Sequence, residues 1–140
     1  MDDCVFCKIV RGEAEASRVY EDDDVLSFMD IFPINPGHTL VIPKGHYPSL
    51  GELPPAVGGR IFQVAMQIER AIRDSNIPCA GTNLLLANGA VAGQEVFHLH
   101  LHIIPRLSGD RSGFRFNSAN RGMPGRAVLN ELAGKIRAGI

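Results

Sequence analysis

The feature that most constrains this chain is a row of alternating histidine and apolar residues in its second half. Residues 97–104 read FHLHLHII and contain three of the five histidines in the sequence. Alternation with a period of two is typical of a β-strand, because successive side chains point to opposite faces of a sheet. The sequence therefore predicts a strand whose histidines face a site. Its other face is expected to join the core through Phe97, Leu99, Leu101 and Ile103.

The histidine face of this strand indicates chemistry rather than packing. Three neighbouring imidazoles are costly to bury unless they are needed, since each carries a donor, an acceptor and a charge that changes near neutral pH. An affinity tag is excluded because the row is internal and contains interleaved leucines. Neighbouring histidines of a strand lie about 6.6 Å apart at Cα and the outer two about 13 Å apart. One metal ion could bind two of them but not readily all three.

Two cysteines spaced by two residues, Cys4 and Cys7, predict half of a metal site. The chain has one other cysteine and no basic export signal at its start, so a metal is expected more than a disulfide. Tetrahedral zinc needs two further ligands, and His46 and His98 complete a set of two cysteines and two histidines. The alternative is a pair of reduced cysteines without a metal. Cys79 has no partner by spacing and is interpreted as a small buried side chain.

The histidine row resembles the signature of the histidine triad (HIT) family, His-φ-His-φ-His-φ-φ, where φ is apolar. Four further blocks occur in the order that the family has. They are Asp30-Ile31 with Pro36-Gly37-His38, Ile42-Pro43-Lys44-Gly45-His46, Ala92-Gly93-Gln94-Glu95-Val96-Phe97 and Pro105-Arg106. Five blocks in order are far more specific than one short motif. The chain is most similar to bacterial-type HIT hydrolases of the zinc-binding Cys-x-x-Cys branch, a group akin to nucleoside phosphoramidases.

The resemblance implies an α+β domain of the HIT-like fold, with a mainly antiparallel sheet and two principal helices. Residues 1–140 are expected to form this single domain, with a core over about 4–106. The patterns agree, since they predict strands over 17–20, 25–30, 39–42 and 82–87. Helices are predicted over 54–75 and 126–138. Their inward residues are expected to be Val57, Ile61, Ala65, Ile68 and Ile72 in the first, and Val128, Leu129, Leu132 and Ile136 in the second.

By resemblance, the site binds a purine nucleotide or a nucleotide conjugate. Asp30 is expected to accept hydrogen bonds from the ribose hydroxyls. Asn88, Gln94 and the backbone near Glu95 and Val96 are expected to contact phosphate or leaving-group oxygens. The base is expected among Val5, Phe6, Ile9, Phe28, Ile31 and Leu40, for which the alternative is ordinary core. Related animal enzymes often carry serine where this chain has Glu95, which leaves leaving-group protonation by serine in doubt.

The resemblance also assigns the catalytic roles. His100 is expected to attack the α-phosphorus as a neutral imidazole and form a nucleotidyl-histidine that water hydrolyses. His102, with His38 behind it, stabilises the developing charge, and His98 is left to the structural zinc. Three alternatives stay open. They are a hydrolase with a catalytic zinc on two triad histidines, a nucleotide-binding module without turnover, and a nucleotidyl transferase that uses the same intermediate.

Length and charge limit the other partners. At 140 residues the chain is long enough to bury a core, and its net charge of −1 with scattered Lys and Arg argues against a nucleic acid polymer. No apolar run approaches the roughly 20 residues of a membrane span. We therefore expect a soluble cytoplasmic protein, and the resemblance implies a homodimer. The polar segment over 107–125 is interpreted as either a mobile flap or an arm over a partner subunit.

Overall fold

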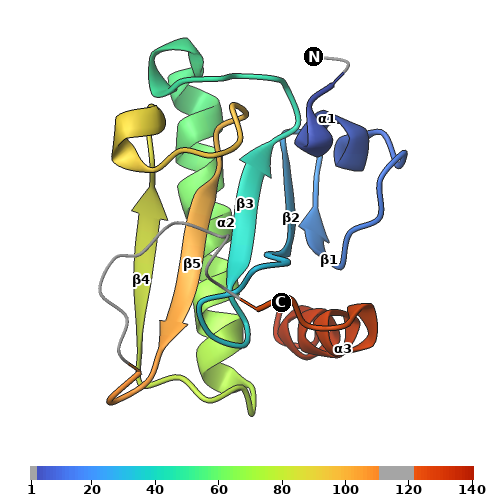
Figure 1. Ribbon diagram of the computed structural model, residues 1–140, viewed down its shortest axis with the longest axis vertical. Coiled ribbons are helices and arrows are strands. Elements are labelled where there is room, and N and C mark those ends of the chain that lie inside the picture. The colour runs from blue at the N-terminus through green and yellow to red at the C-terminus, as the bar shows by residue number, and fades with distance from the viewer. Residues whose placement is uncertain (1–2, 111–121) are drawn as a thin grey trace.

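Five antiparallel strands form one sheet in the computed structural model, which describes residues 3–110 and 122–140 (Figure 1). In chain order the elements are α1 (Val5–Val10), β1 (Arg18–Glu21), β2 (Val25–Met29), β3 (Thr39–Pro43), η1 (Leu50–Glu52), α2 (Pro55–Asp74), β4 (Gly81–Leu86), η2 (Ala90–Ala92), β5 (Leu101–Arg106) and α3 (Arg126–Arg137). The strand order is β1-β2-β3-β5-β4. Because β5 lies between β3 and β4, the sheet carries the end of the histidine row in its interior.

The long helix α2 covers one face of the sheet (Figure 1). It begins with Pro55, whose fixed φ suits the first turn of a helix. The predicted stripe is confirmed, because Ile61, Ala65, Ile68 and Ile72 are buried and Val57 is partly buried. This stripe packs on side chains of the strands that include Val41, Leu101 and Ile103. One hydrophobic core therefore lies between α2 and the sheet.

A second, smaller core lies around the short helix α1. Its buried members are Phe6, Ile9, Leu26, Phe28, Leu40 and Ile42. On β2 and β3 these residues alternate with residues of the first core, so both strands are buried along their whole length. The sheet thus has apolar packing on both faces, and the second core is the one that borders the functional site described below.

Two residues that were predicted to be buried in the core are exposed. Phe97 is 52% exposed and Val128 is 49% exposed, so neither belongs to the core. Strand pairing begins at Leu101, because the preceding residues run beside a loop instead, where the Leu99 amide donates to the carbonyl of Tyr47 at 2.8 Å. The segment over 107–125 was interpreted as a flap or an arm over a partner subunit. Most of it, residues 111–121, lies outside the described residues.

The acidic turn between β1 and β2 is held by hydrogen bonds to Asp22. Asp22 accepts hydrogen bonds from the amides of Asp24 and Val25 and binds Arg60 of α2 at 2.8 Å. Burial raises the pKa of Asp22, but these hydrogen bonds outweigh burial and lower the pKa to about 2. The turn is therefore fixed to α2.

None of the helices in residues 3–110 and 122–140 is long and apolar enough to cross a membrane.

Candidate active site

His100 is held as a neutral imidazole with a defined tautomer. Its Nδ1 donates to the backbone carbonyl of His98 at 2.8 Å, since a carbonyl can only accept. The lone pair is therefore on Nε2. The side chain is buried, and burial lowers the pKa of His100 below its ordinary value. Because the ring also lines a pocket, the site offers an uncharged nitrogen nucleophile to a bound molecule.

A chain of hydrogen bonds fixes the tautomer of His102 as well. The Ile34 amide donates to Nδ1 of His38 at 3.0 Å, so the proton of a neutral His38 is on Nε2. This Nε2 lies 2.9 Å from Nδ1 of His102, which must accept and therefore carries its own proton on Nε2. The rings of His100 and His102 lie 4.9 Å apart between centroids. A lone pair and an N–H donor are thus side by side.

The predicted proximity of His38 to the triad is explained by strand pairing. Thr39 to Val41 of β3 pair with β5, and Leu40 is opposite His102. His38 is fully buried behind His102 and does not belong to the pocket lining. Asp30 lies close to both rings, because its Oδ2 is 3.4 Å from Nε2 of His38 and 3.9 Å from Nδ1 of His102.

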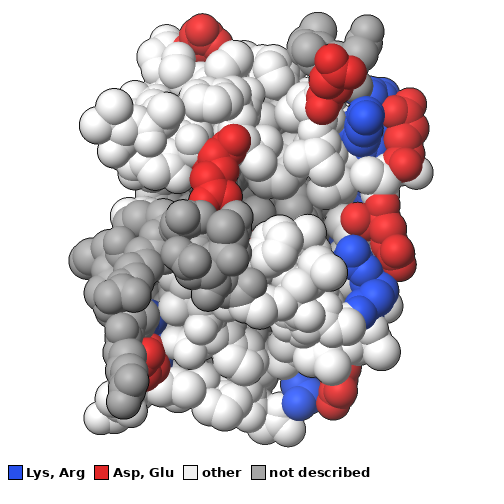
Figure 2. All heavy atoms as spheres, in the orientation of Figure 1, with Lys and Arg blue, Asp and Glu red and all other residues white. Residues whose placement is uncertain are grey.

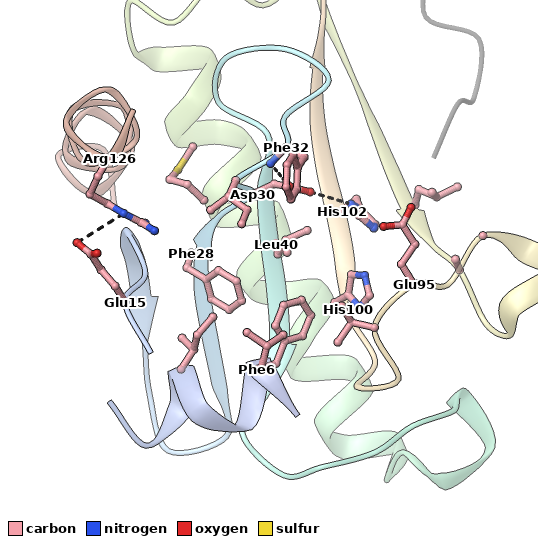
Figure 3. A pocket seen from close by; sticks show the side chains of 18 residues that line it. Phe6, Glu15, Phe28, Asp30, Phe32, Leu40, Glu95, His100, His102 and Arg126 are labelled. Carbon is pink, nitrogen blue, oxygen red and sulfur yellow. Dashed lines mark hydrogen bonds and ion pairs between the residues drawn. The ribbon is translucent and has the colours of Figure 1, made fainter. Parts of the chain in front are cut away.

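An apolar pocket of about 280 Å³ extends away from His100 and His102 (Figure 3). This volume is near the lower end of the range for small-molecule sites, about 300–1,000 Å³. The ring of Phe6 packs edge-on against His100 at 5.1 Å and against Phe28 at 5.3 Å. All six residues predicted to hold a base line the pocket: Val5, Phe6, Ile9, Phe28, Ile31 and Leu40.

Asp30 lines the same pocket between the apolar cluster and the histidines (Figure 3). Its Oδ1 accepts a hydrogen bond from the Phe32 amide at 2.7 Å, so it also shapes the turn after β2. The carboxylate is buried and its position is therefore well defined.

The two cysteines and two histidines predicted to bind a metal converge at the N-terminal end of the histidine row. The ligand atoms of Cys4, Cys7, His46 and His98 all lie within 4.8 Å of one another. Cys4 and Cys7 flank the first turn of α1, which places both thiols on one side. Nε2 of His98 lies 2.8 Å from the Pro43 carbonyl, so it carries the proton and Nδ1 keeps its lone pair toward the thiols.

This donor set fits zinc. Two sulfur and two imidazole nitrogen donors are the ligands of closed structural zinc sites. A ligating histidine usually donates the N–H of its other ring nitrogen to an acceptor such as a backbone carbonyl, as His98 does. Neither His100 nor His102 is a ligand in this group of four, and His98 is its one member from the histidine row.

Comparison with known proteins agrees with this geometry. The model of the family described as HIT domain matches residues 11–109, more than half of the chain. The chain belongs to the HIT family. A HIT relative from Bacillus subtilis, named Protein hit, is 47% identical over 113 residues, which are 81% of this chain and 77% of that protein. Adenylylsulfatase HINT3 of Arabidopsis thaliana is 47% identical over 112 residues, 78% of this chain and 55% of that protein.

Solved structures of HIT proteins have the same fold. A zinc-bound histidine triad family protein from Mycobacterium smegmatis has a TM-score of 0.86 and 41% identity, covering 99% of this chain and 93% of that one. A Hit-like protein from Bartonella henselae has a TM-score of 0.87 and 36% identity, covering 100% and 98%. The predicted α+β HIT-like fold is therefore confirmed. The Cys-x-x-Cys group of this chain is compatible with zinc.

The loop before the HIT signature contains Asn88 and Gln94, whose expected contacts with phosphate stay a prediction. Asn88 and Gln94 do not line the pocket, and both amide side chains bind backbone groups. Asn88 accepts from the Leu50 amide at 2.8 Å. Gln94 is buried, accepts from the Gly89 amide and donates to the Pro48 carbonyl. In this arrangement both residues hold the loop, whereas Glu95 and Val96 do line the pocket next to His100.

Two charged residues of this HIT protein that the sequence did not single out also line the pocket, Glu15 and Arg126. They come from the segment before β1 and from the first residue of α3, so no local spacing joins them. No motif contains either residue, and the periodic pattern of the predicted helix over 126–138 does not include Arg126 among its inward residues. Their position depends on the packing of α3 against β1.

Proposed function

We propose that this HIT protein hydrolyses purine nucleotide conjugates, such as phosphoramidates or dinucleotides, at the α-phosphorus through a nucleotidyl-histidine on His100. The observation that carries this proposal is the tautomer of His100, whose Nε2 lone pair is paired with a pocket suited to a base. Neutral imidazole is a good nucleophile at phosphorus and does not need to lose a proton first. The relative named adenylylsulfatase supports a nucleotide conjugate as the substrate class.

The reaction takes place in two displacements. The lone pair on Nε2 of His100 forms a bond to the α-phosphorus, and the bond from phosphorus to the leaving group breaks. The leaving group takes a proton from the solvent and departs. Water then attacks the same phosphorus and gives up a proton to the solvent, the electron pair of the P–N bond returns to Nε2, and the nucleoside monophosphate is released with His100 neutral again.

The remaining groups bind and orient the substrate. The N–H on Nε2 of His102 donates to a non-bridging phosphoryl oxygen, where negative charge accumulates. His38 is a positioning residue, because it acts on the substrate only through His102. The base lies in the apolar cluster beside Phe6 and Phe28, and the carboxylate of Asp30 accepts hydrogen bonds from the ribose hydroxyls.

Zinc, in this proposal, has a structural role. Cys4, Cys7, His46 and His98 would hold it in a closed tetrahedral site that joins α1 to the start of the histidine row. Bound zinc supplies folding free energy and no reactive group. Such a site requires reduced thiols, which supports a cytoplasmic location.

A homodimer is part of the same proposal. Strand β4 is at the edge of the sheet, and all of its residues are only partly buried. Next to it, α2 exposes Phe62 and Met66, which are 53% and 55% exposed. The hydrogen bond between Glu69 and Thr82 at 3.2 Å places this side of α2 beside β4. An unpaired edge with adjacent exposed apolar side chains supports association of two copies.

The test uses a purine nucleoside phosphoramidate with a fluorogenic amine as leaving group. The variant His100→Ala is expected to lose turnover by roughly 1,000-fold or more. Its affinity for a nucleoside monophosphate, measured by calorimetry, is expected to stay within about threefold of the wild type, because the apolar cluster is intact. Substantial turnover in this variant would contradict the proposal, and retained binding shows that the variant is folded.

A product assay separates hydrolysis from transfer. The wild-type enzyme is supplied with the same substrate and with inorganic phosphate or a sugar as competing acceptors. We expect nucleoside monophosphate as the main product. A nucleotidyl phosphate or nucleotidyl sugar as the main product would instead identify a transferase that uses the same intermediate.

A further inference from the structure

The end of the pocket farthest from the histidines carries two opposite charges. Figure 3 shows Glu15 and Arg126 on one side of the apolar cluster, and His100, His102 and Glu95 on the other. Phe28 and Phe6 lie between the two ends (Figure 3). A molecule that reaches from His100 across this cluster therefore presents its far edge to Glu15 and Arg126.

The guanidinium of Arg126 is fixed by neighbouring residues. Its Nη1 donates to Oγ of Ser17 at 3.1 Å, and this hydroxyl donates in turn to Asn130 at 2.6 Å. Ser17 is buried, with 2% of its surface exposed. Nε of Arg126 lies 3.6 Å from Oε1 of Glu15. Arg126 of α3 is thus held against the segment that precedes β1, and its guanidinium lies beside the carboxylate of Glu15.

The lining between the two ends cannot distinguish one purine from another. Its side chains are apolar, so they recognise the flat shape of a base and not its hydrogen-bonding groups. Asp30 and the histidines lie at the end assigned to the ribose and phosphate. Among the described residues that line this pocket, Glu15 and Arg126 are therefore the ones placed to contact the edge of the base.

We propose that Glu15 and Arg126 read the edge of the base and make the enzyme favour guanine over adenine. This inference rests on the proposed function, because it assumes that the base occupies the apolar cluster. Guanine presents the O6 acceptor next to the N1–H and N2–H₂ donors, and it matches a guanidinium donor beside a carboxylate acceptor. Adenine presents one amino group flanked by two ring nitrogen lone pairs, so a carboxylate that accepts from it also faces a lone pair.

The expected preference is moderate. A well-formed pair between a charged side chain and a base discriminates by about 1–3 kcal/mol, which is roughly five- to 150-fold. The side chain of Glu15 is 72% exposed and that of Arg126 is 30% exposed, so water competes for both. We therefore expect a preference at the lower end of this range, about five- to tenfold in kcat/KM.

The experiment compares guanosine and adenosine phosphoramidates that share one leaving group. For the wild type we expect the guanosine substrate to have the higher kcat/KM, with the difference mainly in KM, because the base is remote from the reacting phosphorus. The variants Glu15→Gln and Arg126→Gln are each expected to bring the two substrates to within about twofold of one another. Binding of guanosine and adenosine monophosphates, measured by calorimetry, is expected to show the same loss of preference.

Two control variants make the same changes of charge at residues that do not line the pocket. Glu13→Gln removes a carboxylate two residues away that is paired with Arg11, and Lys135→Gln removes a cation of the same helix that is paired with Glu131. Both controls are expected to keep the wild-type preference. Equal kcat/KM for the two substrates in the wild type, or an unchanged preference in both pocket variants, would overturn the inference and leave the proposed hydrolase intact.

Failure of the proposed function would have a different result. Neither substrate would then be hydrolysed, and the two monophosphates would still report on the pocket by calorimetry. Tighter binding of guanosine monophosphate that is lost in Glu15→Gln would support recognition of the base without catalysis. Equal affinities for the two nucleotides would reject it.

Discussion

At the scale of single residues, the site depends on where protons are held. His100 donates through Nδ1 to the carbonyl of His98, and the amide of Ile34 sets the tautomer of His38 and, through it, of His102. These assignments follow from backbone groups that can only accept or only donate. Two backbone contacts therefore leave neighbouring rings with different groups on Nε2, a lone pair on His100 and an N–H on His102.

Substitution of His38 tests whether its hydrogen bond sets the tautomer of His102. The variant His38→Phe removes the donor to Nδ1 of His102, so the proton of His102 is no longer confined to Nε2. We expect kcat to fall by roughly tenfold or more with little change in KM. The variant His38→Gln, whose amide can both donate and accept, is expected to recover part of the activity. Equal losses in both variants, with folding verified by circular dichroism, would indicate a packing role alone.

At the scale of elements, the six-residue helix α1 links the proposed zinc site to the pocket. Its first turn is flanked by Cys4 and Cys7, and Phe6 and Ile9 of the same helix line the apolar cluster. Because α1 is too short to be stable alone, its position depends on what it contacts at both ends. We therefore expect loss of the metal to weaken binding of the base in the pocket.

We expect chelation, or the variant Cys7→Ser, to remove zinc, lower Tm by several degrees and raise KM by more than it lowers kcat. The control is Cys79→Ser, which alters the one cysteine outside the group and should keep the zinc content of the wild type. Zinc content by elemental analysis and Tm by calorimetry provide the readouts. A parallel collapse of kcat at unchanged Tm would show that the metal takes part in the reaction.

The β1–β2 turn gives a second prediction at this scale. Asp22 has a folded-state pKa of about 2 and an ordinary value of 3.8, so it stabilises the fold above about pH 4, and this stability is lost as pH falls toward 2. The variant Asp22→Asn is expected to lower the free energy of unfolding by about 1–2 kcal/mol at pH 7 and to weaken its dependence on pH in that window.

Denaturant unfolding between pH 2 and 7 measures this effect. The control is Asp23→Asn, which changes an exposed residue of the same turn. It should leave both the stability and its pH dependence near the wild-type values. An equal effect of the two variants would mean that the general negative charge of the turn matters and the hydrogen bonds of Asp22 do not.

At the scale of the whole molecule, most of the charged side chains visible on one face are grouped along one edge (Figure 2). Figure 2 shows one face of the protein, on which Lys and Arg lie along the edge formed by α1, β1 and α3 next to acidic side chains. The rest of this face is largely uncharged. Among the described residues of this face, the basic side chains alternate with acidic ones and form no continuous basic surface (Figure 2).

The exposed apolar side of α2 predicts the assembly. If two copies associate through β4 and the adjacent Phe62 and Met66, then Met66→Lys should place a charge in the interface and shift the protein toward the monomer. Light scattering coupled to gel filtration measures the molar mass, for which Gln67→Lys on another side of the same helix is the control. A wild-type protein that is monomeric at micromolar concentration would reject this interface.

Much of this molecule could be predicted from its sequence because the signals are local or periodic. The stripe of α2, the strands and the Cys-x-x-Cys pair all have patterns within a few residues. The short helix α1 gave no such pattern, since six residues are too few to show a helical period. The exposure of Phe97 was missed because residues 98–100 lie beside Tyr47 and not within a paired strand. Glu15 and Arg126 meet only through tertiary packing.

The most direct test of the account is the stereochemical course at phosphorus. A nucleoside phosphorothioate conjugate that is chiral at the α-phosphorus is hydrolysed in isotopically labelled water, and the configuration of the product is determined by ³¹P NMR. Attack by His100 and then by water each inverts the configuration, so we expect overall retention. Inversion would show that water attacks the substrate directly, and it would contradict the covalent intermediate on His100.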